Sequence, residues 1–261
     1  ALYGFNLSLQ QIIQVGSSGL WVDLLLVGST LLMGWFVGTR LLGLDRETVL
    51  LTAAGSAICG AAAVVATVPV LKVDEEVVAE KTAVAVATVV LFGTLAMFLY
   101  PLLFSWFGAG HLDFGIYVGS TVHEVAQVVA IGNALGSDVA HHAVIVKMIR
   151  VMLLVPFLLL LGAFVARRAG DGQRGPMTVP WFAVIFVALA GVNSLHVLPE
   201  PVVGGLRLIG ILLLTAAMAA LGVETTLKRM GRAGIRPLLL GAGLFAHLVL
   251  VGGLINWWLG A

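Results

Sequence analysis

The fold is decided by residues 83–107, which read AVAVATVVLFGTLAMFLYPLLFSWF and carry no charged side chain. A helix needs roughly 20 mostly apolar residues to cross the hydrocarbon core of a bilayer, so this segment is long enough to span a membrane. Seven further apolar runs flank it, and we predict about eight spans in all: Leu20–Leu41, Glu47–Leu71, Ala83–Phe107, Phe114–Leu135, Ala143–Val165, Val179–Ser194, Val202–Leu221 and Leu238–Trp258.

The composition of the whole chain agrees with this prediction. Of the 261 residues, 60% are hydrophobic and 10% are charged, and the mean hydropathy is +1.09. These values exclude an ordinary soluble domain. No polar segment is long enough to be a domain linker, so we predict that residues 1–261 form one all-α transmembrane domain, a polytopic membrane helix bundle.

Several classes of partner and site are not expected. The net charge is +1, and no basic cluster is interleaved with aromatic residues, so nucleic acid is not a predicted partner. The single cysteine, Cys59, excludes a disulfide framework and a multi-cysteine metal site. We predict no cofactor and no bound metal.

The distribution of lysine and arginine predicts the orientation, because short cytoplasmic loops accumulate these residues. Strict alternation of the eight spans leaves only Lys72 and Lys81 outside and places nine basic residues inside: Arg40, Arg46, Arg167, Arg168, Arg174, Lys228, Arg229, Arg232 and Arg236. The C-terminus is then outside the membrane. The opening residues, 1–4, are typical of a helix already under way, so we expect the natural protein to be longer at its N-terminus.

Two six-residue segments share a pattern in which Gly55 aligns with Gly119. Gly55-Ser56-Ala57-Ile58-Cys59-Gly60 and Gly119-Ser120-Thr121-Val122-His123-Glu124 each lie near the middle of a predicted span. Small and hydroxyl residues at this depth permit a helix break, and a half-helix N-terminus carries about +0.5 of an elementary charge. We predict two breaks that bind an anion through Gly55, Ser56, Cys59, Gly60, Gly119, Ser120 and Thr121. The alternative is that these small residues only allow close helix packing.

A second, weaker repeat relates residues 2–16 to residues 220–234. The first copy falls outside and the second inside in the predicted topology. This is the relation expected of the inverted repeats of secondary transporters.

Ionisable and polar side chains cluster in the second break. His123 and Gln127 share one helical face at a spacing of four, whereas Glu124 is rotated by about 100°. Ionisable groups at the centre of a bilayer are costly and mark functional sites. Glu124 is predicted either to carry a coupling proton or to be the counter-ion of a buried base, and His123 and Gln127 are predicted to bind substrate.

Two basic residues in the following span are the candidate bases. Arg150 is deep in this span and is predicted to pair with a carboxylate or with substrate. Lys147 either joins that site or extends its side chain to the headgroups. His247 and Asn193 are isolated and are predicted to be structural, and Asp23, Glu200 and Arg207 lie close enough to span ends to be solvated.

Four runs resemble the YeiH family of bacterial inner-membrane proteins, usually labelled putative sulfate exporters. They are residues 55–64 (GSAICGAAAV), 83–94 (AVAVATVVLFGT), 115–129 (GIYVGSTVHEVAQVV) and 147–151 (KMIRV). The resemblance covers essentially the whole chain and implies about three further N-terminal spans, for a total near eleven. It also implies the fold of the cation-proton antiporter and anion transporter superfamily, with inverted repeats, broken helices and an elevator or rocking cycle.

We therefore predict a secondary transporter that exports a small anion, such as sulfate or a related sulfur oxyanion or sulfonate, and is not an enzyme. Protons are a candidate coupling ion, the lipid bilayer is the surrounding partner, and a homo-oligomer is a candidate assembly. One alternative is an intramembrane metal-dependent hydrolase, because His123-Glu124 matches the first half of a HExxH motif; Gln127 stands where the second histidine would be. An anion channel is a third hypothesis, although no filter sequence is visible.

Overall fold

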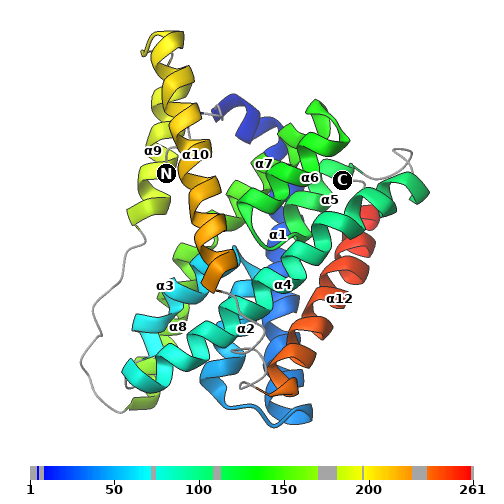
Figure 1. Cartoon of the computed structure of the whole chain (residues 1–261), viewed down its shortest axis with the longest axis vertical. Coiled ribbons are helices and arrows are strands. Elements are labelled where there is room, and N and C mark those ends of the chain that lie inside the picture. The colour runs from blue at the N-terminus through cyan, green and yellow to red at the C-terminus, as the bar shows by residue number, and fades with distance from the viewer. Residues whose placement is uncertain are drawn as a thin grey trace.

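The computed structural model describes residues 5, 9–71, 75–107, 113–169, 181–195, 197–224 and 234–259. The regular elements in these ranges are all helical (Figure 1). They are α1 (Leu9–Phe36), the π-helical turn η2 (Val37–Leu41), α2 (Arg46–Ala57), α3 (Ala61–Leu71), α4 (Glu75–Phe107), α5 (Phe114–Thr121), α6 (Val125–Leu135), α7 (Ser137–Met152), α8 (Leu154–Ala169), α9 (Trp181–Ser194), α10 (Glu200–Glu224) and α12 (Ile235–Leu259).

The distribution of side chains between surface and interior is that of a membrane protein. Four segments in the described ranges are long and apolar enough to cross a bilayer: Ser18–Leu41, Val77–Trp106, Ser137–Val165 and Ile235–Leu259. Large apolar side chains are exposed along α4, including Phe98 and Trp106, whereas Lys147 and Arg150 are fully buried. An apolar surface around a charged interior suits a hydrocarbon solvent, and the prediction of an all-α membrane bundle is confirmed.

Helices α2 and α3 form a hairpin that enters and leaves at the same end of the bundle. Lys81, near the start of α4, contacts Asp45, the N-cap of α2. The end of α3 at Leu71 is only four residues before the start of α4 at Glu75, a separation that the chain covers in at most ~14 Å. Therefore α3 returns to the end where α2 begins, and the tip of the hairpin is residues 58–60.

Helices α5 and α6 form a second hairpin, which enters from the other end (Figure 1). Asp113, the N-cap of α5, contacts His142 in the second turn of α7, and α6 ends at Leu135 just before α7 begins. The tip of this hairpin is residues 122–124. In Figure 1 the first hairpin lies in the lower half beside α8, and the second lies in the upper half beside α7.

The two hairpins correct the predicted topology. Glu47–Leu71 and Phe114–Leu135 were predicted as single spans, but each is a pair of antiparallel helices. Hydropathy cannot distinguish these cases, because about 20 apolar residues suffice either for one crossing or for two half-crossings. Lys81 therefore lies at the same end as Asp45 and Arg46, and its predicted place on the opposite side is wrong.

The predicted pair of helix breaks is confirmed, and the alignment of Gly55 with Gly119 extends over both hairpins. In the same register, the first and last residues of α3, Ala61 and Leu71, align with the first and last residues of α6, Val125 and Leu135. The hairpins have opposite directions, as an inverted repeat requires. The second predicted repeat, residues 2–16 and 220–234, lies partly outside the described residues and stays a prediction.

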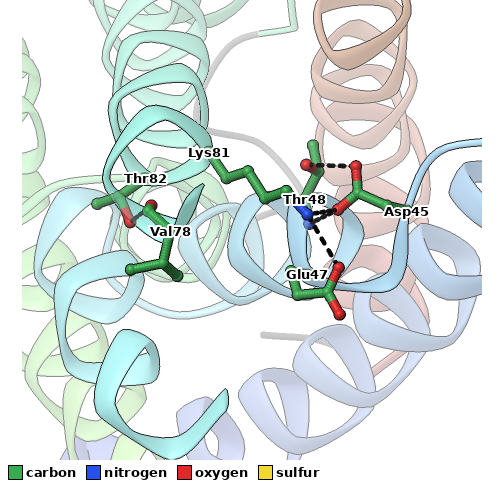
Figure 2. A network of polar contacts seen from close by, with 6 residues as sticks. All are labelled: Asp45, Glu47, Thr48, Val78, Lys81 and Thr82. Carbon is green, nitrogen blue, oxygen red and sulfur yellow. Dashed lines mark hydrogen bonds and ion pairs between the residues drawn. The ribbon is translucent and has the colours of Figure 1, made fainter. Parts of the chain in front are cut away.

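An aspartate lies at the open end of each hairpin, where its first helix begins: Asp45 in the first hairpin and Asp113 in the second. Asp45 accepts a hydrogen bond from the backbone N–H of Thr48 (3.0 Å), and its carboxylate also pairs with Lys81 (2.7 Å) (Figure 2). Glu47 binds the same ammonium group at 3.0 Å. Partial burial raises the pKa of Asp45, but hydrogen bonds from Lys81 and Thr48 outweigh it and hold the pKa at about 2.

The topology can be tested by labelling single cysteines with a membrane-impermeant reagent in a Cys59→Ala background. Arg46→Cys, Glu80→Cys and Asp138→Cys all replace exposed side chains. We expect positions 46 and 80 to be labelled from the same face of the membrane and position 138 from the other face. Labelling of positions 46 and 80 from opposite faces would restore the single-span topology for residues 47–71.

The base of the first hairpin predicts an acid dependence. Because the pKa of Asp45 is about 2 in the folded protein and 3.8 in its ordinary state, the carboxylate stabilises the fold above pH 3.8. This contribution is lost as the pH falls through about 2. The Tm difference between wild type and Asp45→Asn in detergent is therefore expected to be constant from pH 7 to pH 5 and to shrink below pH 4. A difference that already disappears at pH 5 would contradict the ion pair.

Candidate functional site

The tips of both hairpins are bound by two basic residues of α7. Lys147 donates hydrogen bonds to the carbonyl oxygens of Ile58 and Val122, both at 2.8 Å. Arg150 donates from Nε to Ala57 (2.6 Å), from Nη2 to Ser56 (2.8 Å) and from Nη1 to Val122 (3.3 Å). Because the two bases are three residues apart, they share one face of α7, and Val122 is bound by both.

These carbonyl groups are the C-terminal ends of α2 and α5. The end of a helix leaves carbonyl groups without intrahelical partners and carries about −0.5 of an elementary charge. Two such ends meet here in a fully buried region, where no water can satisfy them. The positive charges of Lys147 and Arg150 offset both ends, and the hydrogen bonds hold the two tips together.

Glu124 joins the tips from the other side. Its carboxylate accepts a hydrogen bond from the backbone N–H of Ala61 (3.2 Å), the first residue of α3. Gly60 makes this contact possible: its φ is +67°, and a methyl group there would overlap Cγ of Glu124 and lie 2.8 Å from Oε1. A carboxylate at a helix N-terminus is favourable, so Glu124 stabilises the start of α3.

Gln127 is fixed at the start of α6. Its Oε1 accepts from the backbone N–H of Glu124 (3.1 Å), and its side-chain amide packs directly on Gly93 of α4. The Nε2 atom of Gln127 is buried and has no hydrogen-bond partner. Gly93 is therefore part of the site, although the sequence analysis did not select it.

The two hydroxyl groups at the end of α5, on Ser120 and Thr121, make hydrogen bonds to neighbouring side chains and to the backbone. Thr121 accepts from the hydroxyl of Tyr100 (2.7 Å) and donates to the carbonyl of Tyr117. Ser120 donates to Tyr117 (3.2 Å) and accepts from Nδ2 of Asn256 on α12 (3.3 Å). Tyr100 and Asn256 were not predicted, because neither lies in the motif and only the fold brings them to it.

Several other buried polar atoms around the tips have no hydrogen-bond partner. Both ring nitrogens of His123 and the hydroxyls of Ser56 and Thr52 belong to this group. His123 is fully buried, with its ring 6.1 Å from that of Phe245. Buried polar groups almost always have partners, so unpartnered ones mark places where a ligand, ion or water can bind.

Asp23 is the functional candidate that the sequence analysis missed. It was predicted to be solvated near a span end, but it is completely buried, and neither carboxylate oxygen has a hydrogen-bond partner. The prediction was wrong because the helix begins at Leu9, so Asp23 lies in its middle. The available signal was an acidic residue four positions after Gly19 on one helix face.

The predicted site residues fall into distinct places. Gly55, Ser56, Gly119, Ser120 and Thr121 lie at the C-terminal ends of half-helices, so the tip N–H groups come from the residues that follow, such as Ala61. Cys59 is buried in an apolar cluster with Ile58 and Val151.

The alternative in which Lys147 extends its side chain to the lipid headgroups is wrong, since its ammonium group binds the hairpin tips at the centre. His247 is bonded to Ser29 (3.1 Å), in agreement with its structural prediction.

Residues 1–241 match the model of the family described as Conserved hypothetical protein 698. The chain belongs to this family. It is similar to the UPF0324 inner membrane protein YeiH of Escherichia coli K12, with 50% identity over 98% of this chain and 73% of the relative.

Further relatives agree with this assignment to the family. A UPF0324 membrane protein of Yersinia pestis is 50% identical over 98% of this chain and 72% of its own length. One from Photorhabdus laumondii is 47% identical over 98% and 73%. No solved structure matches the chain. The resemblance to the YeiH family is confirmed.

Within the described ranges, no three histidine, cysteine, aspartate or glutamate side chains come together in a group that could hold a metal ion. Lys147 and Arg150 are the two fully buried basic side chains at this centre.

The contact of Gly60 with Glu124 predicts a measurable cost for Gly60→Ala. Gly43→Ala is the matched control, because Gly43 has a similar φ of +63° and a methyl group there would meet only Nη1 of Arg236 at 4.0 Å. We expect backbone strain alone to cost about 1–2 kcal/mol in the control, and overpacking to add roughly 1–3 kcal/mol in Gly60→Ala. Thermal or denaturant unfolding in detergent measures both, and equal losses would show that the Glu124 contact is unimportant.

Proposed function

We propose that this protein is a secondary transporter of a small anion in the bacterial inner membrane, with the C-terminus outside. The observation that carries the proposal is the meeting of two oppositely directed hairpin tips at buried Lys147 and Arg150. Discontinuous helices at the midplane, related by an inverted repeat, are the usual construction of a substrate site in secondary transporters.

The charges and donors of the site support an anionic substrate. The bonds to the tips use three of the five N–H groups of Arg150 and two of the three ammonium protons of Lys147. The remaining donors, together with the unpartnered side chains of His123 and Ser56, are of the kind that bind oxyanions. Sulfate, sulfite and sulfonates are the substrate class that we propose.

Energetics also support export, which is the direction of transport that we propose. With a negative interior, outward movement of an anion gains about 2.3 kcal/mol per charge per 100 mV. Export of a divalent anion then needs no further source of energy. Coupling to protons would adjust the direction and the extent of transport.

The test is flux of radiolabelled sulfate and sulfite in proteoliposomes that contain the purified protein, with and without a pH gradient. We expect saturable flux that protein-free liposomes lack. Absence of saturable flux for both anions would contradict the proposed substrate class, and a flux that does not saturate would favour the channel alternative.

Arg150→Ala is expected to abolish this flux, because it removes a buried positive charge that binds both tips. Arg236→Ala is the matched control, since Arg236 is exposed at the start of α12, and it is expected to leave flux unchanged. Arg150→Lys keeps the charge and should retain flux with a higher KM. Full flux in a folded Arg150→Ala protein would remove Arg150 from the substrate site.

A further inference from the structure

Asp23 differs from the other buried acidic residue of the site in its bonding. Glu124 accepts a hydrogen bond at the start of α3, whereas both oxygens of Asp23 are buried without any partner. An ionised carboxylate that is deprived of water and of hydrogen-bond donors is strongly unfavourable. Its charge must therefore be offset by neighbouring charges or removed by a proton.

The packing of α1 places Asp23 at the level of the two bases. One turn before it, Gly19 packs on Val146 of α7, and one turn after it, Val27 shares a buried cluster with Val151. Asp23 lies between Gly19 and Val27 on α1, and Lys147 and Arg150 lie between Val146 and Val151 on α7. The two pairs of contacts therefore place Asp23 at the same level as the two bases. Neither base donates a hydrogen bond to Asp23, so their charges act on its carboxylate through space.

No other described charge competes for this position. On the elements that pack against α1, the remaining charged or titratable groups lie at the ends of the bundle or are already bonded. At one end of the bundle lie Arg40 of η2, Arg46 and Glu47 of α2, and Arg236 of α12. At the other end lie Asp138 and His141 of α7, and Asp113 before α5 pairs with His142 of α7. Closer to the centre, Tyr117 of α5 donates to Val249 and His247 of α12 binds Ser29, and the described residues of α9 carry no charge.

We propose that Asp23 is the proton-exchanging carboxyl group of the transport site, and that it competes with the substrate anion for the positive charge of Lys147 and Arg150. This inference rests on the proposed function. Without substrate, the two bases stabilise the ionised carboxylate. When an anion binds to them, that stabilisation is lost, and the carboxylate takes a proton from water and forms an O–H bond.

The consequence is one proton bound with each substrate anion. Nothing is oxidised or reduced, and the proton leaves again when the anion departs. Glu124, which the sequence made a candidate proton carrier, has a positioning role in this scheme, because its carboxylate is committed to the start of α3. The two acids of the site therefore separate into one that holds the tips together and one that exchanges a proton.

The experiment counts protons during anion binding. The purified protein in detergent and weak buffer is titrated with sulfate or methanesulfonate, which stay fully ionised near neutral pH, while an indicator dye reports proton uptake. Wild type is expected to take up about one proton per anion, and its affinity should weaken about tenfold per unit rise in pH. Asp23→Asn should bind the anion with no proton uptake and little pH dependence.

Two further variants separate the carboxyl groups. Asp138→Asn makes the same change at an exposed residue and is expected to match wild type. Glu124→Gln is expected to weaken anion binding, because it removes the bond to the start of α3, but to keep an uptake of about one proton per bound anion. Undiminished uptake in Asp23→Asn, or its loss in Glu124→Gln alone, would overturn the inference while the proposed function stands.

Failure of the proposed function has a different signature, because wild type would then bind neither anion and show no flux, and the inference would fall with it. If Asp23→Asn does not fold, Asp23→Glu decides. It keeps the carboxyl group in an altered position, so proton uptake should persist with a shifted pH midpoint. An unchanged midpoint would place the titrating group elsewhere.

Discussion

The hydrogen bonds from Lys147 and Arg150 to the carbonyl ends of α2 and α5 are the interaction on which the rest of the structure depends. A helix that stops halfway through a membrane leaves carbonyl groups that neither lipid nor water can satisfy. Here two such ends share one pair of cations, and Val122 is bound by both. The hairpins can therefore end at mid-depth, and two segments that are well separated in the chain are held against the same helix, α7.

The inverted repeat supplies two similar hairpins, but their tips are not equivalent. In the register that aligns Gly55 with Gly119, Cys59 and Gly60 of the first tip correspond to His123 and Glu124 of the second. Because Gly60 has no side chain, Glu124 can reach the start of α3, and nothing at position 60 can reach the start of α6 in return. The backbone symmetry builds the site, and the departure from symmetry at these tip positions determines which polar groups remain available.

Much of the fold and part of the site could be predicted from the sequence. The break positions follow from glycine and hydroxyl residues at mid-depth, and the motif around His123 and Arg150 marks the centre. The return of each hairpin could not be predicted, because the length and hydropathy of a half-helix pair equal those of one span. Only a tertiary contact such as Asp45 with Lys81 distinguishes them. Asp23 was missed because the start of its helix, not its own surroundings in sequence, determines its depth.

The long apolar segment Ser137–Val165 is divided into α7 and α8, and this division explains how it contacts both hairpins. Pro156 lacks an N–H group and displaces the carbonyl of Met152, and α7 ends at that residue before α8 begins at Leu154. The half before the interruption packs on α5 and α6, whereas Leu158 and Leu161 of α8 pack on the first hairpin. Lys147 and Arg150 lie in the last two turns before this interruption, where the surroundings change from one hairpin to the other. A base a few turns away in either direction would lie beside the body of one hairpin and would reach neither tip, so the position of the interruption and the position of the bases are a single constraint.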